Sequence, residues 1–178
     1  MEAPDEELML AYRHGDAGAF DSLYRRHRGA LFRYVLRGVR ERALAEELYQ
    51  EIWIRVIEAR SRYEPRARFT TWLYTIAHNR MVDHWRERGL SLVALDDAPE
   101  VADPSGDPAR GAAARESLRS LAAALEALPP AQREAFLLHE EAGLSVAEIA
   151  AATGTNEEAA KSRLRYAIAR LKAAVDHG

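Results

Sequence analysis

Apolar residues recur every three or four positions over most of the chain, a spacing that predicts α-helices. In the first half of the chain, this pattern predicts four helices at residues 5–14, 17–37, 42–60 and 70–88. The third of these helices should turn one apolar face inward, made of Leu44, Leu48, Ile52, Val56 and Ile57. No segment alternates apolar and polar residues with a period of two, so we expect no β-sheet and an all-α fold.

A change in composition divides the chain into two parts. Residues 92–115 hold three prolines, two glycines, five acidic residues and no aromatic residue. Such a composition is typical of an extended or disordered linker. We therefore expect a helical domain at residues 1–88, an acidic linker rich in proline, alanine and glycine at residues 89–115, and a second helical domain at residues 116–178.

The second domain is predicted to be a helix-turn-helix. Ser145 can cap one short helix, with Glu148 at its third position to cap back, and Gly154 suits the tight turn that follows. We expect Thr155 and Glu158 to repeat this capping box on the next helix. That helix carries polar and basic side chains suited to phosphates and base edges, namely Lys161, Ser162, Arg163, Arg165 and Tyr166. Many proteins insert such a helix into the DNA major groove.

The predicted helix at residues 70–88 holds a second candidate site. One stripe at helical spacing contains Trp72, Ile76, Asn79, Asp83 and Arg86, next to an arginine-rich loop. Aromatic rings stack on unpaired bases, guanidinium groups bind phosphate, and an Asn amide can hydrogen-bond a base edge. The same stripe is also typical of ordinary core packing with arginines on a solvated face, and the pattern alone favours that interpretation.

The charge of the chain limits its affinity for DNA. The whole chain has a net charge of −3, with +2 on residues 1–88, −3 on residues 89–115 and −2 on residues 116–178. A protein that holds DNA unaided usually has a basic excess. Either the helix-turn-helix does not bind DNA, or another component supplies most of the affinity.

Several other classes of protein are excluded or disfavoured. The chain has no cysteine, which excludes disulfides and zinc ribbons, and its six histidines are scattered, so we expect no metal and no cofactor. No glycine-rich phosphate loop, nucleophile elbow or paired-carboxylate site is evident, so we expect no enzyme and no small-molecule substrate. The acidic residues 1–7 do not resemble a secretory signal, and no stretch approaches about 20 apolar residues, so we expect a cytoplasmic protein without membrane insertion.

Three segments together resemble the extracytoplasmic-function (ECF) sigma factors of bacterial RNA polymerase, group IV of the sigma-70 family. Residues 45–56, AEELYQEIWIRV, resemble the family's A-E-D-L-x-Q-E-V-F-x-x-V helix. Residues 69–86, FTTWLYTIAHNRMVDHWR, resemble its F-x-T-W-L-x-x-I-A-x-N-x-x-x-D-x-x-R helix. Residues 128–163 resemble its L-P-x-x-x-R-E, L-S-x-x-E-I-A and K-S-R series. The order and spacing are family-like over nearly everything except the linker.

The resemblance implies a transcription initiation factor that binds core RNA polymerase, recognises −35 and −10 promoter elements and helps to open the DNA. It implies docking on the β′ clamp helices through Glu47, Gln50 and Glu51. It implies a −10 site made of Tyr63, Arg66, Arg68, Phe69, Trp72, Asn79, Arg80, Asp83 and Arg86, with Asn79 at a pocket for a flipped base. The −35 site would comprise Asn156, Lys161, Ser162, Arg163, Arg165 and Tyr166. A contact with the β flap and a cognate anti-sigma factor are also implied.

One departure from the family and two alternatives remain open. Where the family often has I-P-x-G-T-V, this chain has TNEEAA at residues 155–160, and its two glutamates would repel phosphate, although a glutamate can also accept from cytosine. A stand-alone helix-turn-helix regulator would bind promoters tightly without polymerase, which the acidic balance disfavours. A small helical enzyme or adaptor would need a convergent polar site, and none is evident in the sequence.

Overall fold

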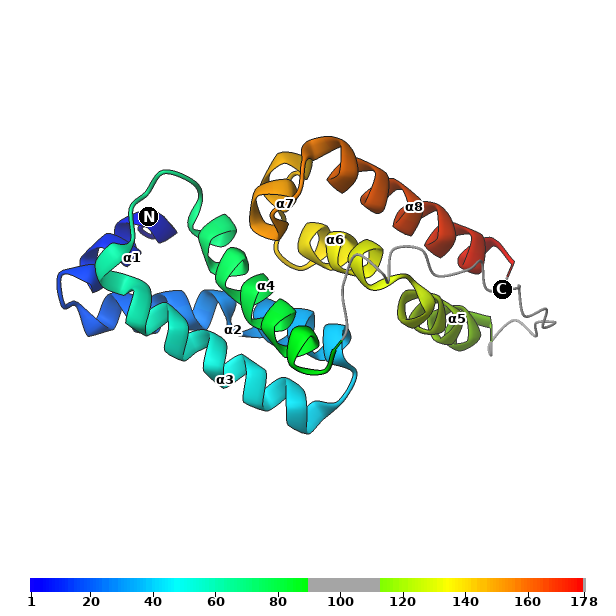
Figure 1. Ribbon diagram of the computed structural model, residues 1–178, viewed down its shortest axis with the longest axis horizontal. Helices are drawn as coiled ribbons and strands as arrows, with labels where there is room; N and C mark the ends of the chain where they lie inside the picture. Colours follow the sequence, from blue (N-terminus) through cyan, green and yellow to red (C-terminus); the bar gives the residue numbers. More distant parts are fainter. Residues whose placement is uncertain (90–112, 178) are drawn as a thin grey trace.

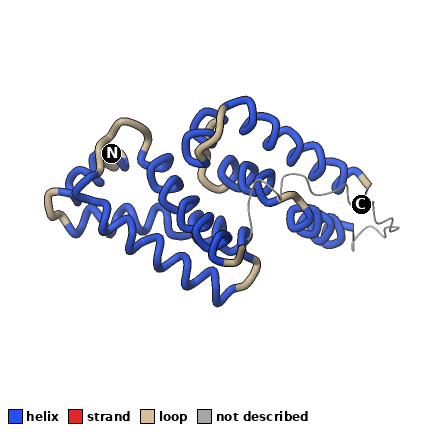
Figure 2. Tube along the Cα trace, viewed as in Figure 1, coloured by secondary structure: helices blue, strands red, loops and turns tan. Residues whose placement is uncertain are grey.

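The structure, a computed structural model, describes residues 1–89 and 113–177, which are helical and contain no strand (Figures 1 and 2). The N-terminal helices are α1 (Asp5–Arg13), α2 (Ala17–Val39), α3 (Arg42–Ala59) and α4 (Phe69–Glu87), with a short 3-10 helix, η1 (Arg60–Arg62), after α3. The C-terminal helices are α5 (Ala113–Ala127), α6 (Pro130–Glu140), α7 (Val146–Thr153) and α8 (Glu157–Asp176). The predicted all-α fold is confirmed.

The predicted linker falls mainly on residues 90–112, which lie outside the described residues. Its last three positions do not belong to a linker, because helix α5 already begins at Ala113. The sequence 113–127 is rich in alanine and leucine, which are strong helix formers, and this propensity extends the helix beyond the predicted boundary.

Helix α7 is capped as its sequence predicts. Ser145 accepts from the backbone N–H of Glu148 at 3.2 Å, and the Glu148 carboxylate accepts from the backbone N–H of Ser145 at 3.1 Å. Gly154 ends the helix with φ 67°, a left-handed conformation that glycine adopts without steric cost. These two features fix both ends of a helix only eight residues long.

The second predicted capping box is wrong. Asn156 caps α8, and its side-chain oxygen accepts from the backbone N–H of Ala159 at 2.8 Å. Thr155 instead completes the end of α7, because its backbone N–H donates to Ala150 O at 3.0 Å. This six-to-one bond is typical of a helix that ends at a left-handed glycine, and it shifts the start of α8 by one residue.

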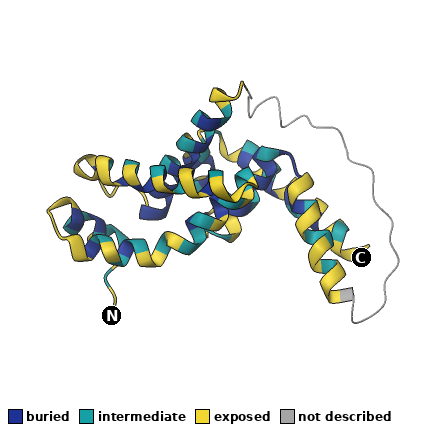
Figure 3. Ribbon diagram, turned by 90° about the horizontal axis from the view of Figure 1, so that it is seen from below, coloured by how far each residue is buried: buried dark blue, intermediate teal, exposed yellow. Residues whose placement is uncertain are grey.

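Aromatic residues occupy much of the N-terminal core, and Figure 3 shows the buried positions along the inward faces of the helices. Tyr63 and Phe69, at the two ends of the loop between η1 and α4, are fully buried and lie against Trp72 with ring centroids 5.0 and 5.9 Å away. The predicted inward position of Ile57 is wrong, because this side chain is 38% exposed. Val56 takes the buried place, and Ile57, about 100° further round the helix, lies at the edge of the apolar face.

Contacts from α1 hold the same loop in place. Arg13 donates to the carbonyl of Tyr63 at 2.8 Å, and the Glu6 carboxylate accepts from the backbone N–H of Phe69 at 2.7 Å. The residue that precedes α4, Arg68, makes no capping hydrogen bond of its own. Glu6 therefore satisfies a backbone donor that the first turn of α4 would otherwise leave unpaired.

Candidate nucleic-acid interface

An open cavity of about 210 Å³ lies between α3, η1 and α4. Its lining comprises Arg55, Glu58, Ala59, Arg62, Ile76 and Asn79. Asn79 is exposed, so its amide is available to a molecule entering the cavity. Arg55 is oriented by an ion pair of 3.0 Å with Asp83 on α4. The site thus combines an amide, two guanidinium groups, one carboxylate and an apolar wall, which suits one planar ring with hydrogen-bonding edges.

Four of these lining residues were missed by sequence reasoning. Arg55, Glu58 and Ala59 share one face of α3, and Arg62 follows in η1 at the same spacing of three to four residues. The spacing alone does not show which other helix this face meets. The facing stripe becomes recognisable only once α3 packs beside α4.

The predicted aromatic contacts of the −10 site lie mostly inside the protein. Tyr63 and Phe69 have no exposed surface, and Trp72 is only partly exposed. Burial, reinforced by Glu6 and Asp5, raises the pKa of Tyr63 to about 12. These rings pack on one another and fix the loop before α4, so in this conformation Tyr63 and Phe69 have no face on which a base could stack.

The arginines predicted for the −10 site differ in how they are held. Arg80 forms an ion pair with Glu51 on α3, and Arg66 forms one with Glu64 at 2.6 Å. Arg68 donates to Glu148 of the C-terminal domain at 3.3 Å. Arg86 is exposed at the C-terminal end of α4. Arg80 thus braces α3 against α4, with only 11% of its side chain exposed.

The predicted docking face on α3 is only partly free. Glu47 and Gln50 are exposed, as expected for a surface that meets a partner. Glu51 lies at the edge of this surface, where its side chain is 36% exposed and pairs with Arg80 on α4. The sequence reasoning also missed Ile54, which lies one turn beyond Gln50 and is 52% exposed.

Helix α8 presents an exposed basic surface near its start. Lys161 and Arg165 are exposed one turn apart, and the Arg165 guanidinium lies 5.2 Å from the ring centroid of Tyr166. Ser162 and Arg163 are half-buried. The predicted contact residue Asn156 is exposed, but its side-chain oxygen caps the helix.

Glu157 and Glu158 also lie exposed in the first turn of α8, where the helix dipole favours acidic groups. They stand between Asn156 and Lys161, so the approach of a phosphate to this end of the helix is opposed. The exposed cations of α8 begin one turn further along.

The fold separates the two groups of candidate residues. The −10 candidates gather around α4 and the −35 candidates along α8, on opposite sides of α7 (Figure 1). Within residues 1–89 and 113–177, no three metal-binding side chains come together. None of the helices described is long and apolar enough to cross a membrane.

Comparisons with known proteins give one consistent result. Residues 23–90 match Sigma-70 region 2, and residues 118–171 match Sigma-70, region 4. The RNA polymerase sigma factor CarQ of Myxococcus xanthus is 35% identical over 173 residues, which cover 92% of this chain and 93% of CarQ. The ECF RNA polymerase sigma factor SigM of Mycobacterium tuberculosis (strain ATCC 25618 / H37Rv) is 32% identical over 171 residues, 96% of this chain and 84% of SigM.

A solved structure agrees with these relatives. CnrH, in complex with the cytosolic domain of CnrY, superposes with a TM-score of 0.69 at 25% identity, covering 97% of both chains. An exposed basic helix that follows a tight turn in a helix-turn-helix is a common DNA-binding element. The chain belongs to the ECF RNA polymerase sigma factors, and it is a transcription initiation factor that recognises promoters. The resemblance and the leading function are confirmed, and the stand-alone regulator is not favoured.

Proposed function

We propose that residues 1–88 dock on core polymerase and capture a base of the −10 element, while residues 116–178 bind the −35 element. The observation that carries this proposal is the cavity between α3 and α4, because an exposed Asn79 lines it together with Arg55 and Arg62. An Asn amide offers both a donor and an acceptor to a base edge. A flipped base costs a few kcal/mol to unstack, which hydrogen bonds and packing in such a cavity would repay.

Docking on the polymerase is assigned to the exposed surface of α3. Glu47 and Gln50 would meet the β′ clamp helices, and Ile54 adds an apolar contact on the same face. Charged and polar groups around an apolar centre are typical of specific interfaces. Glu51 would contribute indirectly, by holding Arg80 and thereby the packing of α3 on α4.

The remaining partners follow from the family. A second polymerase contact, with the β flap, is assigned to the C-terminal domain. CnrH was solved with the cytosolic domain of CnrY, which supports a cognate anti-sigma partner for this chain. The protein would act in the cytoplasm, where polymerase and promoter DNA lie, and it would contribute no covalent step of its own.

The test of the base-binding site is Asn79→Ala in transcription with purified core polymerase. We expect the variant to retain polymerase docking, while open-complex formation on a native promoter falls about tenfold or more. A template pre-melted over the −10 region should recover most of the loss, because the free-energy cost of unpairing the bases has been removed. Permanganate footprinting reports the opening directly. Glu87→Gln, on α4 but outside the cavity, is the control and should open the promoter normally. Normal opening by Asn79→Ala would make Asn79 a structural residue.

A further inference from the structure

Helix α1 contacts η1 and α4 and holds both ends of the loop that joins them (Figure 1). Arg13 donates to the Tyr63 carbonyl at 2.8 Å, where the loop begins. The backbone N–H of Phe69 donates to the Glu6 carboxylate at 2.7 Å, where the loop ends. Tyr63 and Phe69 are fully buried, whereas residues 64–68 between them are exposed. The loop is therefore fixed at two buried ends and presents an exposed tip.

Helix α1 is itself held against α2 and η1. Near its start, the Asp5 carboxylate accepts from Arg26 of α2 at 2.9 Å and lies 2.7 Å from Nε2 of His27. Near its end, Arg60 of η1 donates to the hydroxyl of the buried Tyr12 at 3.2 Å, and the guanidinium lies 5.2 Å from the centroid of that ring. Contacts at both ends of α1 thus give the two hydrogen bonds to the loop a fixed support.

The same loop connects the two walls of the cavity that is proposed to take a flipped base. Arg62 of η1 lines one wall and directly precedes the loop. Asn79 lines the other wall on α4, the helix that begins where the loop ends. The exposed tip carries Arg66 and Arg68, two of the residues predicted for the −10 site. The conformation of the loop therefore determines how the two walls and the tip lie relative to one another.

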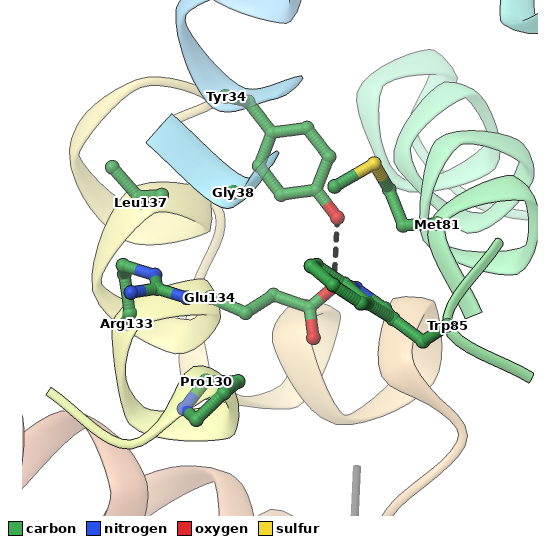
Figure 4. Close-up of a pocket in the computed structure, with 8 residues that line it drawn as sticks. All are labelled: Tyr34, Gly38, Met81, Trp85, Pro130, Arg133, Glu134 and Leu137. Carbon is green, nitrogen blue, oxygen red and sulfur yellow. Dashed lines mark hydrogen bonds between the residues drawn. The ribbon is translucent and has the colours of Figure 1, made fainter. Parts of the chain in front are cut away.

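A second cavity lies between α2, α4 and α6, but it has no room for a base. It measures about 30 Å³, which is enough for no more than one or two water molecules. The Glu134 carboxylate points into it and accepts from the Tyr34 hydroxyl at 2.7 Å (Figure 4). The geometry that matters for base capture is therefore that of the cavity between α3, η1 and α4.

Loss of the Glu6 contact would leave a backbone donor of the loop without its partner. The Phe69 N–H lies in the first turn of α4, where backbone donors have no acceptor within the helix. An unpaired buried donor is costly, so the end of the loop would shift until the donor found water or another acceptor. A displacement of about 1 Å at a site that must match one ligand geometry can reduce activity by up to about a hundredfold.

We propose that Glu6 and Arg13 are positioning residues for −10 recognition, because from α1 they hold the loop of residues 63–69 in the conformation that aligns the base cavity with the arginines of the tip. This inference rests on the proposed function, and neither side chain contacts the DNA. The segment that matches Sigma-70 region 2 begins at residue 23, so α1 supports the site from outside that segment.

Two variants remove the supports, and each has a matched control. Glu6→Ala removes the acceptor, while Glu6→Gln keeps a side-chain oxygen that can accept from Phe69 and is the conservative rescue. Arg13→Met keeps the apolar stem and removes the donors. Glu7→Ala on the same helix and Arg25→Ala on α2, both at exposed positions, are the controls. Circular dichroism and urea unfolding establish that every variant is folded under the conditions of the assays.

Amide hydrogen exchange in the loop tests the support directly and needs neither polymerase nor DNA. We expect local opening of residues 63–72 to rise about tenfold in Glu6→Ala and in Arg13→Met, the change expected for one lost hydrogen bond. Glu6→Gln and both controls should exchange like wild type. Unchanged exchange in both test variants would overturn the proposal.

Transcription with purified core polymerase tests the role in promoter recognition. In the two test variants, we expect docking on polymerase to be retained and opening of a native promoter to fall about three- to tenfold. Discrimination among the four bases at the captured −10 position should narrow by about threefold or more, and Glu6→Gln should restore it. A merely structural role lowers the amount of active protein without changing the discrimination between bases. Faster loop exchange with unchanged discrimination would therefore overturn the positioning role.

Failure of the proposed function has a different signature. Normal opening and discrimination by Asn79→Ala would remove the base site itself, and the positioning role with it, even where exchange in the loop rises. Impaired opening by Asn79→Ala, together with full opening and discrimination by Glu6→Ala and Arg13→Met, would overturn only the positioning role.

Discussion

At the residue scale, Lys161 and Arg165 are the exposed cations best placed for DNA on α8. A lost base contact costs about 1–3 kcal/mol and relaxes preference at one position, whereas a lost phosphate contact weakens all sequences alike. We expect Lys161→Ala and Arg165→Ala each to reduce transcription from a two-element promoter by about 5- to 150-fold. Lys172→Ala, exposed near the far end of the same helix, is the control. Full activity of both test variants would place the −35 contacts elsewhere.

The lowered pKa of Asp5 should make the folding stability of the protein depend on pH. A hydrogen bond from His27 at 2.7 Å, opposed by partial burial and helped by Arg26, holds the pKa of Asp5 below its usual 3.8. An acid with a lowered folded-state pKa stabilises the fold above its unfolded pKa and loses that contribution as pH falls below it. Asp5→Asn should therefore destabilise the protein at pH 7, and its difference from wild type should shrink below about pH 4.

Urea unfolding at a series of pH values from 7 to 3 measures this difference. Asp21→Asn is the control, because Asp21 pairs with Arg25 where both side chains are more than half exposed, and such pairs contribute little. A pH-independent gap between wild type and Asp5→Asn would show that Asp5 acts through packing rather than through its charge.

At the element scale, the turn between α7 and α8 depends on one backbone conformation. Gly154 has φ 67°, and an added Cβ would meet no atom within 4 Å, so any cost of substitution comes from the backbone alone. Gly154→Ala should lower the free energy of unfolding by about 1–2 kcal/mol. Gly154→Asn should lower it less, because asparagine tolerates the left-handed region better. Thermal or urea unfolding measures the free energy of unfolding of each variant. An equal loss of stability in both variants would contradict an explanation based on backbone conformation.

The helices themselves were predictable because their signals are local. Apolar spacing, the capping box of α7 and Gly154 each act within a few residues, and the structure confirms each of them. The second cap was misassigned because Thr155 and Asn156 are both good caps, and only the end of α7 decides between them.

The candidate site was predicted less completely, because its geometry depends on how α3 and α4 pack. The sequence identified Asn79, but it could not show that Arg55 of α3 and Arg62 of η1 face the same cavity. It also could not show that Tyr63 and Phe69 are fully buried, since aromatic residues in a loop are equally compatible with stacking on bases. The contacts between the domains join residues up to 108 positions apart, and no local pattern reports them.

At the whole-molecule scale, the net charge of the chain makes its binding to DNA depend on core polymerase. The net charge is −3 overall and −2 on residues 116–178, so few phosphates can be neutralised by the C-terminal domain alone. Glu134, Glu141 and Glu148 contribute to that acidity, and their carboxylates accept hydrogen bonds from the more basic N-terminal domain. The same charge pattern disfavours binding of the isolated chain to DNA without polymerase.

We accordingly expect the isolated chain to bind a promoter duplex only weakly. Fluorescence anisotropy at physiological salt should give a dissociation constant of about 1 μM or weaker, in the range of non-specific binding, with strong dependence on salt. Addition of core polymerase should tighten binding by about a thousandfold or more, because the polymerase supplies phosphate contacts and holds both domains on one DNA molecule. A duplex with scrambled −35 and −10 elements controls for non-specific association. Nanomolar binding of the isolated chain to the promoter duplex would contradict this division of labour and favour a stand-alone regulator.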